Sequence, residues 1–444
     1  MSTPRKRKQT KPPSSHSVRG TKLRVAVITG TRAEFGLLVP VMDAIRTRND
    51  LHLLVVAAGA HFLPPARTIR EVQSRYPIAA RVPMQRHGKS GRAADALALG
   101  RGVQGFARAF ARLKPDWVVV LGDRIEAFAA ASAASIAGIA VCHIHGGDRA
   151  EGIADEAMRH AITKLSHLHC AATKLSAERI QKMGEDPEHV HITGSPSLDG
   201  LENIPPCSEA DLGELSTVRT VVLLHPSGLA ADQESKLVQT LIAAIDESAA
   251  GDILALAPNH DPGHEIILQA LHVRAQTPND CLQHWAEDDG SSRLVVLSSA
   301  SEESAGHLGD RRWFFRQHLP REHFIGLLKY ITSTNVGLLA GNSSAGLIEA
   351  ASIGVNVLNV GPRQNGRERA GWIEEMPDSN FESGVEAITA LLNRAGDREV
   401  LGELVHGEIS PSPYGDGRAG PRIAALLART NPRDPALLRK RNSY

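Results

Sequence analysis

The sequence predicts an α/β protein made of two doubly wound domains, each built on a parallel sheet. Short apolar runs alternate with helix-forming segments along most of the chain, which is the pattern of strand–helix–strand units. The clearest case is 118–148, where two apolar runs flank an alanine-rich segment that has no Pro or Gly before position 138. The pattern stops in a polar, Pro-containing stretch at 202–218 and then restarts. We therefore place the domain boundary in that stretch.

The predicted domain organisation follows from these changes in pattern. It comprises a basic, disordered tail at 1–21, an N-terminal Rossmann-like domain at 22–201, a C-terminal Rossmann-like domain at 217–400 with an acidic surface insertion at about 276–312, a C-terminal helical segment at 401–430 that packs back across the domains, and a tail at 431–444. The first tail is rich in Pro, Ser and basic residues and has almost nothing to bury.

The individual elements are predicted from periodicity and from Gly and Pro positions. Strands are expected at 23–29, 51–57, 117–121, 139–144, 169–172, 189–193, 220–224, 253–257, 336–340 and 357–360. Helices are expected at 37–46, 102–113, 127–137, 155–166, 176–183, 232–248, 347–352 and 419–429, with a loop over 84–104.

Bulk composition excludes several classes of function. The net charge of +1 gives no reason to expect nucleic-acid binding or attraction to a membrane surface. The four cysteines have no CxxC spacing, and Cys142 and Cys170 lie in apolar runs, which favours a reducing cytoplasm. No apolar run reaches the roughly 18 residues that a membrane span requires.

Polar side chains gather where two neighbouring strands of the first domain end. Asp123 and Arg124 follow one strand, and His143, His145 and Asp148 lie at the end of the next. Ligands of open parallel sheets bind outside the carboxyl ends of the strands. These five residues are therefore expected at one edge of a crevice.

The segment GNSSAGLIEA is the most specific signal of the second domain. Gly341 allows a tight turn after a strand, and Asn342 or Ser343 can cap the helix that follows. The free N–H groups of a helix start suit a diphosphate, to which Ser343 and Ser344 add hydroxyl donors. Glu349 would then accept hydrogen bonds from a ribose. The alternative is an ordinary N-cap with a solvent-facing Glu.

Two arginines in the next strand-end loop, Arg363 and Arg367, favour the phosphate interpretation. GTRAEFG follows the first strand of the chain in the same way, but it lacks the glycines of a dinucleotide fingerprint. Arg32 in that segment is interpreted as a phosphate or sugar contact. Pairing with a surface carboxylate is the alternative.

The histidines and the turn after 257 leave further alternatives open. His143 and His145 with Asp148 suggest zinc, but no third ligand has convincing spacing, so hydrogen-bonding or acid/base work is favoured. His225 ends a strand, so its ring can point into the crevice. The helix pairs Asp155–Arg159 and Glu156–His160 fit a solvent-exposed face, although Asp155 can equally face the crevice. Asn259 and Asp261 also fit simple turn residues.

The chain resembles the hydrolysing UDP-N-acetylglucosamine 2-epimerases of sialic-acid synthesis from about 22 to 427. The motifs that carry the resemblance, in order, are GTRAEFGLL, LGDR, HIHGGD, EGIADEAMRHAITKLSHLH, ITGSP, HP, PNHDPG, GNSSAGLIEA, GPRQNGR and SPYGDG. The resemblance implies a GT-B fold with two facing Rossmann-like domains, and a homo-oligomer, dimer or tetramer.

The chemistry that the resemblance implies is elimination followed by hydration. A base removes the proton on C2 of the sugar, UDP leaves from C1, and water adds to the glycal with inversion at C2. This needs no metal and no cofactor. The expected catalytic residues are Asp123, His145, Asp155 and His225, and the expected substrate or UDP contacts are Arg32, Arg124, Asn259, Gly341, Asn342, Ser343, Ser344, Glu349 and Arg363.

One motif departs from part of the family. Several relatives read HIEGGE where this chain has His145 and Asp148, and the first Glu is a catalytic candidate there. His145 fits an acid/base role at neutral pH. It equally fits a changed substrate, because HIHGG occurs in a branch associated with UDP-N,N′-diacetylbacillosamine and legionaminic acid. A non-hydrolysing epimerase, another GT-B glycosyltransferase and a non-catalytic UDP-sugar-binding protein are further alternatives.

Overall fold

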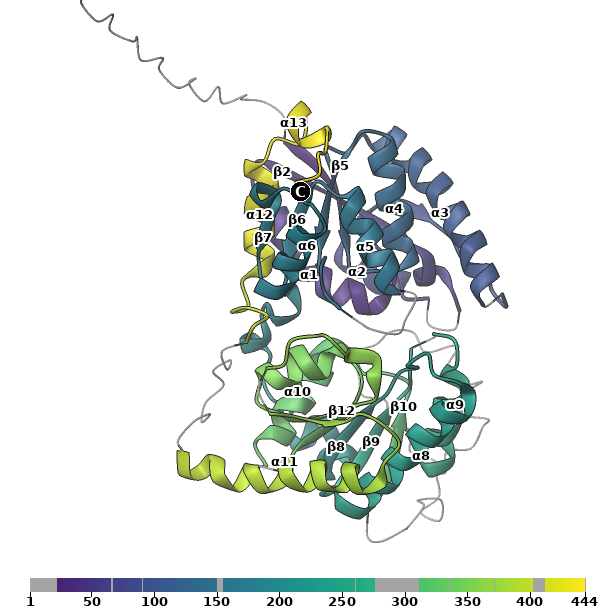
Figure 1. Cartoon of the computed structure of the whole chain (residues 1–444), viewed down its shortest axis with the longest axis vertical. Coiled ribbons are helices and arrows are strands. Elements are labelled where there is room, and N and C mark those ends of the chain that lie inside the picture. The colour runs from purple at the N-terminus through teal and green to yellow at the C-terminus, as the bar shows by residue number, and fades with distance from the viewer. Residues whose placement is uncertain are drawn as a thin grey trace, which may run out of the picture.

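Two parallel sheets, each covered by helices, form the protein, as the sequence predicts (Figure 1). The computed structural model describes residues 22–64, 67–89, 91–149, 155–259, 261–275, 311–334, 336–370, 372–401 and 412–443. The predicted tail at 1–21 and the predicted insertion up to residue 310 lie outside these ranges. No helix in the described part is long and apolar enough to cross a membrane.

The first sheet has the strand order β3-β2-β1-β4-β5-β6-β7. Its strands are β1 (Leu23–Thr29), β2 (Leu51–Ala58), β3 (Ile78–Val82), β4 (Trp117–Leu121), β5 (Ala140–Ile144), β6 (Leu168–Ala171) and β7 (Val190–Ile192). Every pair is parallel. Because β1 pairs with both β2 and β4, the chain reverses direction across the sheet at β1. Loops after β1 and β4 therefore lie side by side at the carboxyl edge.

The second sheet repeats this arrangement with the order β10-β9-β8-β11-β12-β13. Its strands are β8 (Val218–Leu223), β9 (Asp252–Leu256), β10 (Trp313–Arg316), β11 (Leu338–Gly341), β12 (Asn356–Val360) and β13 (Ile373–Met376). Here β8 pairs with both β9 and β11, so the loops after β8 and β11 meet at the point of reversal. The sequence pattern does not reveal β3, β10 and β13, which lie toward the edges.

Helices cover both faces of each sheet, and buried apolar side chains fill the space between. The helices of the first domain are α1 (Arg32–Thr47), α2 (Ile69–Arg75), α3 (Arg92–Leu113), α4 (Ile125–Ile136), α5 (Asp155–Leu165) and α6 (Lys174–Lys182). Those that follow are α7 (Glu209–Leu212), α8 (Ala231–Ser248), α9 (His264–Ala275), α10 (Arg321–Thr332), α11 (Phe381–Leu401), α12 (Ala419–Arg429) and α13 (Pro435–Leu438).

Helix α3 begins at Arg92, so most of the loop predicted over 84–104 is helical. The prediction fails because glycines in this stretch suggested irregular backbone. A Cβ atom on Gly102 would lie 2.5 Å from Met84 Cε and 2.9 Å from Ala129 Cβ. A Cβ on Gly105 would lie 2.5 Å from Val82 Cγ1. These glycines therefore serve close packing of α3 on α4 and β3.

The last part of the chain returns to the first domain (Figure 1). Helix α12 packs on α1, and Trp117 of β4 donates its indole N–H to the carbonyl of Leu427 at 3.1 Å. Gly420 allows the two helices to come into close contact, because a Cβ there would lie 2.6 Å from the carbonyl oxygen of Pro40 in α1. Its amide also donates to Asp199, which fixes the start of α12. The predicted tail at 431–444 contains helix α13 and packs on the same domain.

We expect Gly420→Ala to lower the free energy of unfolding by about 1–3 kcal/mol, because the added methyl overlaps the backbone of α1. Gly100→Ala is the control, since a Cβ at this exposed position of α3 meets nothing within 4 Å. That change should raise stability by up to about 1 kcal/mol through helix propensity alone. Urea denaturation of both variants measures the difference. Equal effects of the two changes would contradict the proposed contact between α12 and α1.

Candidate active site

The carboxyl edges of the two sheets face each other and are joined by an ion pair. Arg124, which follows β4, contacts the carboxylate of Asp261, which follows β9, at 3.1 Å. Asp261 also accepts from Arg363 at 2.9 Å and from the side-chain amide of Asn259 at 2.7 Å. Burial alone would raise the pKa of Asp261, but Arg124, Arg363 and the hydrogen bonds lower it overall. Two guanidinium groups from opposite domains thus converge on one anion.

Asp123, the central residue of LGDR, is held by a buried arginine. Arg159 of α5 pairs with the Asp123 carboxylate and donates to the carbonyl oxygen of Asp148 at 2.9 Å. The side chain of Arg159 is 3% exposed, whereas that of Asp123 is 17% exposed. Burial lowers the pKa of Arg159, and the nearby Arg367 lowers it further. The predicted pair of Asp155 with Arg159 involves a side chain, that of Asp155, which lies outside the described part of the structure.

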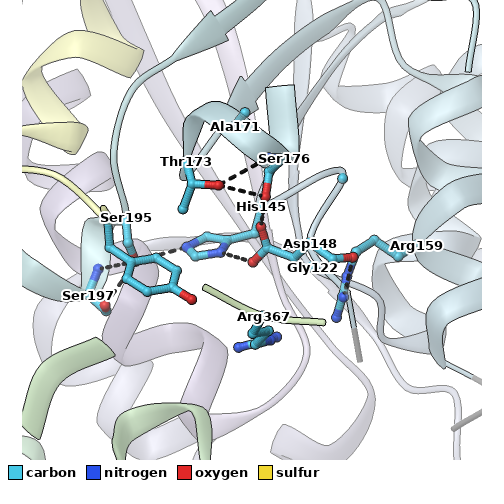
Figure 2. A network of polar contacts seen from close by, with 12 residues as sticks. Gly122, His145, Asp148, Arg159, Ala171, Thr173, Ser176, Ser195, Ser197 and Arg367 are labelled. Carbon is cyan, nitrogen blue, oxygen red and sulfur yellow. Dashed lines mark hydrogen bonds and ion pairs between the residues drawn. The ribbon is translucent and has the colours of Figure 1, made fainter. Parts of the chain in front are cut away.

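His145 lies between two buried oxygen atoms, and both of its ring nitrogens are engaged (Figure 2). Nδ1 contacts the Asp148 carboxylate at 2.8 Å, and Nε2 contacts the Ser195 hydroxyl at 2.9 Å. Its φ of +63° is unusual for a residue with a side chain. Burial would raise the pKa of Asp148, but His145, Arg367 and the hydrogen bond from Ser176 lower it. In this geometry, His145 is held between Asp148 and Ser195.

His143 does not join the crevice edge as predicted, because its side chain is fully buried in the domain. Nε2 contacts the carbonyl oxygen of Gly122 at 2.8 Å, and Nδ1 contacts the Thr163 hydroxyl at 3.1 Å. Burial lowers its pKa to about 3, so the ring is neutral at pH 7. His143 therefore fastens the LGDR loop to α5. Among the described residues there is no cluster of three His, Cys, Asp or Glu suited to a metal.

His225 follows β8 and is oriented by the loop after β9. Its Nδ1 accepts a hydrogen bond from the backbone N–H of Asn259 at 3.1 Å. Burial lowers the pKa of His225 to about 3, with a further contribution from Arg363. A neutral ring whose Nδ1 accepts must carry its proton on Nε2. His225 therefore presents a hydrogen-bond donor rather than a base.

Asn342 organises the point of reversal in the second sheet rather than facing solvent. It accepts from the backbone N–H of His225 at 2.7 Å and donates to the His225 carbonyl at 2.8 Å and the Ser227 hydroxyl at 3.0 Å. Gly341 precedes it at a φ of +148°, where a Cβ would lie 2.0 Å from the carbonyl oxygen of Leu223. Ser343 accepts from the backbone N–H of Ala345, so it caps the helical turn.

Glu349 lies in a π-helical turn, Gly346–Ala350, which follows the half-buried Ser344. Its carboxylate contacts Arg321 of α10 at 3.3 Å, and Arg321 also donates to the carbonyl of Ser197 in the first domain. Burial raises the pKa of Glu349, while Arg321 opposes the shift. Arg321 therefore connects the GNSSAG segment to the loop that carries Ser195.

Arg32 forms an ion pair with Glu71 at 3.0 Å, which is the alternative interpretation of this residue. The neighbouring Glu34 closes a capping box and accepts from the amides of Gly30 and Thr31 at 3.1 Å each. Glu126 also lies against Gly30, since a Cβ on Gly30 would be 2.5 Å from Glu126 Cγ. Burial and Glu126 raise the pKa of Glu34 to about 7.

Several residues of this region escape the sequence analysis as site candidates. They are Glu34, Glu126, Arg159, Ser195, Asp261 and Arg321. Glu34 lies within the motif GTRAEFGLL, and Glu126 follows the motif LGDR. Each lies in the first turn of a helix, where a glutamate is typical of ordinary helix capping. Asp261 reads as a turn residue. Ser195 and Arg321 are far from their partners along the chain, so spacing carries no signal for them.

Two facing Rossmann-like domains that meet at the carboxyl ends of their strands define the GT-B class of fold. Solved structures agree, although identities under 25% bear on the fold alone. A UDP-GlcNAc 2-epimerase from Neisseria meningitidis bound to UDP-GlcNAc matches with a TM-score of 0.69 and 18% identity over 92% of this chain and 100% of that chain. One from Methanocaldococcus jannaschii with UDP-GlcNAc and UDP matches with a TM-score of 0.65 and 18% identity, over the same shares.

The sequence comparisons identify the family. The family model described as UDP-N-acetylglucosamine 2-epimerase matches residues 43–428. A UDP-N,N′-diacetylbacillosamine 2-epimerase (hydrolyzing) from Legionella pneumophila is 30% identical over 95% of this chain and 99% of its own. A UDP-N-acetylglucosamine 2-epimerase from Neisseria meningitidis is 31% identical over 78% of this chain and 81% of its own. The chain belongs to the UDP-N-acetylglucosamine 2-epimerase family and is an enzyme of that family.

The Glu34–Glu126 pair gives a pH prediction. The pKa of Glu34 rises from its usual 4.5 to about 7, so the folded protein holds this proton more tightly than the unfolded chain. The free energy of unfolding should therefore fall as pH rises from about 4.5 to about 7. Glu126→Gln removes the neighbouring charge and should reduce that fall by on the order of 1 kcal/mol.

Urea denaturation at about pH 4 and about pH 8, one value on each side of this range, checks the effect. Glu188→Gln is the control, because Glu188 is exposed and far from the pair along the chain. A pH dependence of Glu126→Gln that equals the wild-type dependence would show that the two carboxyl groups do not interact.

Proposed function

We propose that the protein is a hydrolysing 2-epimerase that converts a UDP-2-acetamido sugar into the free 2-epimeric sugar and UDP. The observation that carries the proposal is the convergence at the facing sheet edges. Asp123 lies beside Arg124, which contacts Asp261 of the other domain. Arg363 contacts the same carboxylate, and His225 accepts from the amide of Asn259 in the same loop. A carboxylate, an imidazole N–H and two guanidiniums are the groups that eliminating a diphosphate from a sugar requires.

Arg124 and Arg363 are suited to the diphosphate. Each is a permanent cation with a planar set of donors that matches phosphate oxygens. Both now share the single carboxylate of Asp261, at 3.1 Å and 2.9 Å. A bound diphosphate would take these donors over, and the negative charge that develops as UDP leaves would be stabilised from both domains. The Nε2 proton of His225 offers a further donor to the same group.

Asp123 is the proposed base that takes the proton from C2. Arg159 fixes its carboxylate at the edge of the first sheet, where part of it stays exposed. The C2–H electron pair forms the C1–C2 double bond while the C1–O bond breaks and UDP departs with that bonding pair. Water then adds across the glycal, with hydroxyl at C1 and a proton at C2 on the opposite face. Asp155 and His145 are the candidates for delivering or guiding that second proton.

The HIHGGD segment bears on the identity of the sugar. His145 and Asp148 are hydrogen-bonded to each other, so they form one unit rather than two separate replacements for glutamates. The Legionella pneumophila relative, which is named for its action on UDP-N,N′-diacetylbacillosamine, matches 95% of this chain. We therefore propose two candidate substrates, UDP-N,N′-diacetylbacillosamine and UDP-N-acetylglucosamine. From UDP-N-acetylglucosamine, the product would be N-acetylmannosamine.

The test incubates the purified chain with each of the two UDP sugars and follows the products by NMR. Release of free UDP together with the 2-epimeric free sugar is the expected result. Appearance of an intact UDP-linked epimer would instead indicate a non-hydrolysing epimerase. Transfer of sugar to an added acceptor would indicate a glycosyltransferase, and UDP binding without any product would indicate a binding protein. Each of these three outcomes would contradict hydrolysis.

We expect Asp123→Asn to lower kcat by at least about a hundredfold while UDP still raises the melting temperature, because the base is lost but the diphosphate contacts remain. The double variant Ser344→Ala, Arg363→Ala should show the opposite pattern, with UDP binding weakened more than kcat is lowered. Kinetics and thermal shift with UDP measure both. An unfolded Asp123→Asn variant would assign Asp123 a structural role as the partner of Arg159.

Asp261→Asn should bind UDP several-fold more tightly than wild type, because a negative charge beside the diphosphate is removed. Without UDP, the same variant should be less stable, since two guanidiniums lose their anion. Calorimetric titration with UDP and urea denaturation without it measure the two effects, with Arg363→Ala as the comparison. Weaker UDP binding in Asp261→Asn would show that Asp261 supports the ligand directly.

A further inference from the structure

The segment that follows α13 inserts a lysine at the end of helix α5. Lys440 donates to the carbonyl oxygens of Thr163, Lys164 and Ser166 at 3.0, 2.7 and 2.6 Å. The last carbonyl groups of an α-helix have no partner within the helix, and they carry the negative end of its dipole. An ammonium group placed among them donates hydrogen bonds to these carbonyl groups and offsets the negative end of the dipole. Lys440 is largely buried, with 22% of its side chain exposed.

A buried glutamate completes the site of Lys440. The carboxylate of Glu185, which is 2% exposed, contacts Lys440 at 2.6 Å, Lys164 at 2.7 Å and His169 at 3.1 Å. Burial would raise the pKa of Glu185, but hydrogen bonds from His169, Lys164 and Lys440 lower it to about 2. Glu185 is thus ionised at neutral pH. It ties the segment, α5 and β6 together.

The chain after Lys440 adds two further contacts to the same place. Asn442 accepts from Lys164 Nζ at 2.7 Å, and the backbone N–H of Ser443 donates to the carbonyl of Gly184 at 2.9 Å. The segment therefore lies along the carboxyl end of α5 and the turn after α6. Figure 1 places the end of the chain over this part of the first domain, beside β6. Asn442 and Ser443 are themselves exposed, so the largely buried part of this attachment is the contact of Lys440 with Glu185 and the end of α5.

Helix α5 has the candidate site at its other end. It begins at Asp155, and Arg159, one turn further on, holds Asp123. The helix is only 11 residues long, and residues 150–154 before it are not described. A short helix is marginal by itself and depends on tertiary contacts for its position. The contacts of Lys440 are therefore in a position to decide where Arg159 and Asp123 lie.

We propose that Lys440 and Glu185 are positioning residues for the reaction: together they fix the carboxyl end of α5 and so hold Arg159 against Asp123. The kinetic part of this inference rests on the proposed function, whereas the structural part does not. The segment 439–443 thus acts on the active site through the length of α5 and touches no substrate. Its loss should affect kcat more than substrate binding, because Arg124 and Arg363 lie on other elements.

The test compares Lys440→Met with Arg441→Met in the full chain. Both remove one positive charge from the same segment, but Arg441 is exposed. Lys440→Met should lower kcat for UDP release by about tenfold or more with little change in KM. Hydrogen exchange should become faster in α5 and stay unchanged in β1 and β8. Arg441→Met should match wild type in every measurement.

Wild-type kcat and wild-type exchange of α5 in Lys440→Met would overturn the inference, as would a loss confined to KM. If Lys440→Met does not fold, Lys440→Arg takes its place, because it keeps the cation but cannot reproduce the ammonium geometry among three carbonyls. It should show faster exchange in α5 and a lower kcat, and unchanged values would overturn the inference. Absence of UDP release by the wild type would overturn the proposed function instead, and the exchange data would still decide whether Lys440 fixes α5.

Discussion

The buried guanidinium of Arg159 connects the three segments from which the first half of the candidate site is built. It belongs to α5, pairs with Asp123 after β4 and donates to the Asp148 carbonyl after β5. A guanidinium that is 3% exposed is very costly to bury without partners. Both loops and the helix must therefore form together. His143 repeats the connection, since it joins the Gly122 carbonyl to Thr163 of the same helix.

Arginine side chains also determine how the second domain meets this unit. Arg124 reaches Asp261, and Arg321 joins Glu349 to the Ser197 carbonyl. Arg367 donates to the carbonyl of Arg149 at 3.0 Å, beside the loop that carries Asp148. Apolar packing of Ala172, Leu198 and Leu201 in the core cluster of the second domain also joins the two domains. The contacts of the arginines themselves are ion pairs and single hydrogen bonds. Such contacts are exchangeable, so a dianionic ligand that enters between the domains can replace some of them without disturbing either core.

The sequence predicts the fold well because buried parallel strands and alternating helices leave a strong periodic signal, as β1, β4 and β5 do. It misses β3, β10 and β13 at or near the sheet edges, and it misreads α3, where Gly102 and Gly105 serve packing. The motifs find the loops of the candidate site but not the partners of their side chains. Arg159 looks like a surface residue by spacing, and Ser195 lies 50 residues from His145. Such pairings depend on how separate elements pack, which local pattern does not encode.

We propose that turnover depends on the carboxylate of Asp123, held in place by Arg159. A double-mutant cycle in the rate of UDP release, with Asp123→Asn, Arg159→Met and the two combined, tests this dependence. If Arg159 acts through Asp123, each single change lowers kcat strongly, and the double variant is no slower than the slower single variant. Folded variants whose losses multiply, or an Arg159→Met variant with wild-type kcat, would contradict the account.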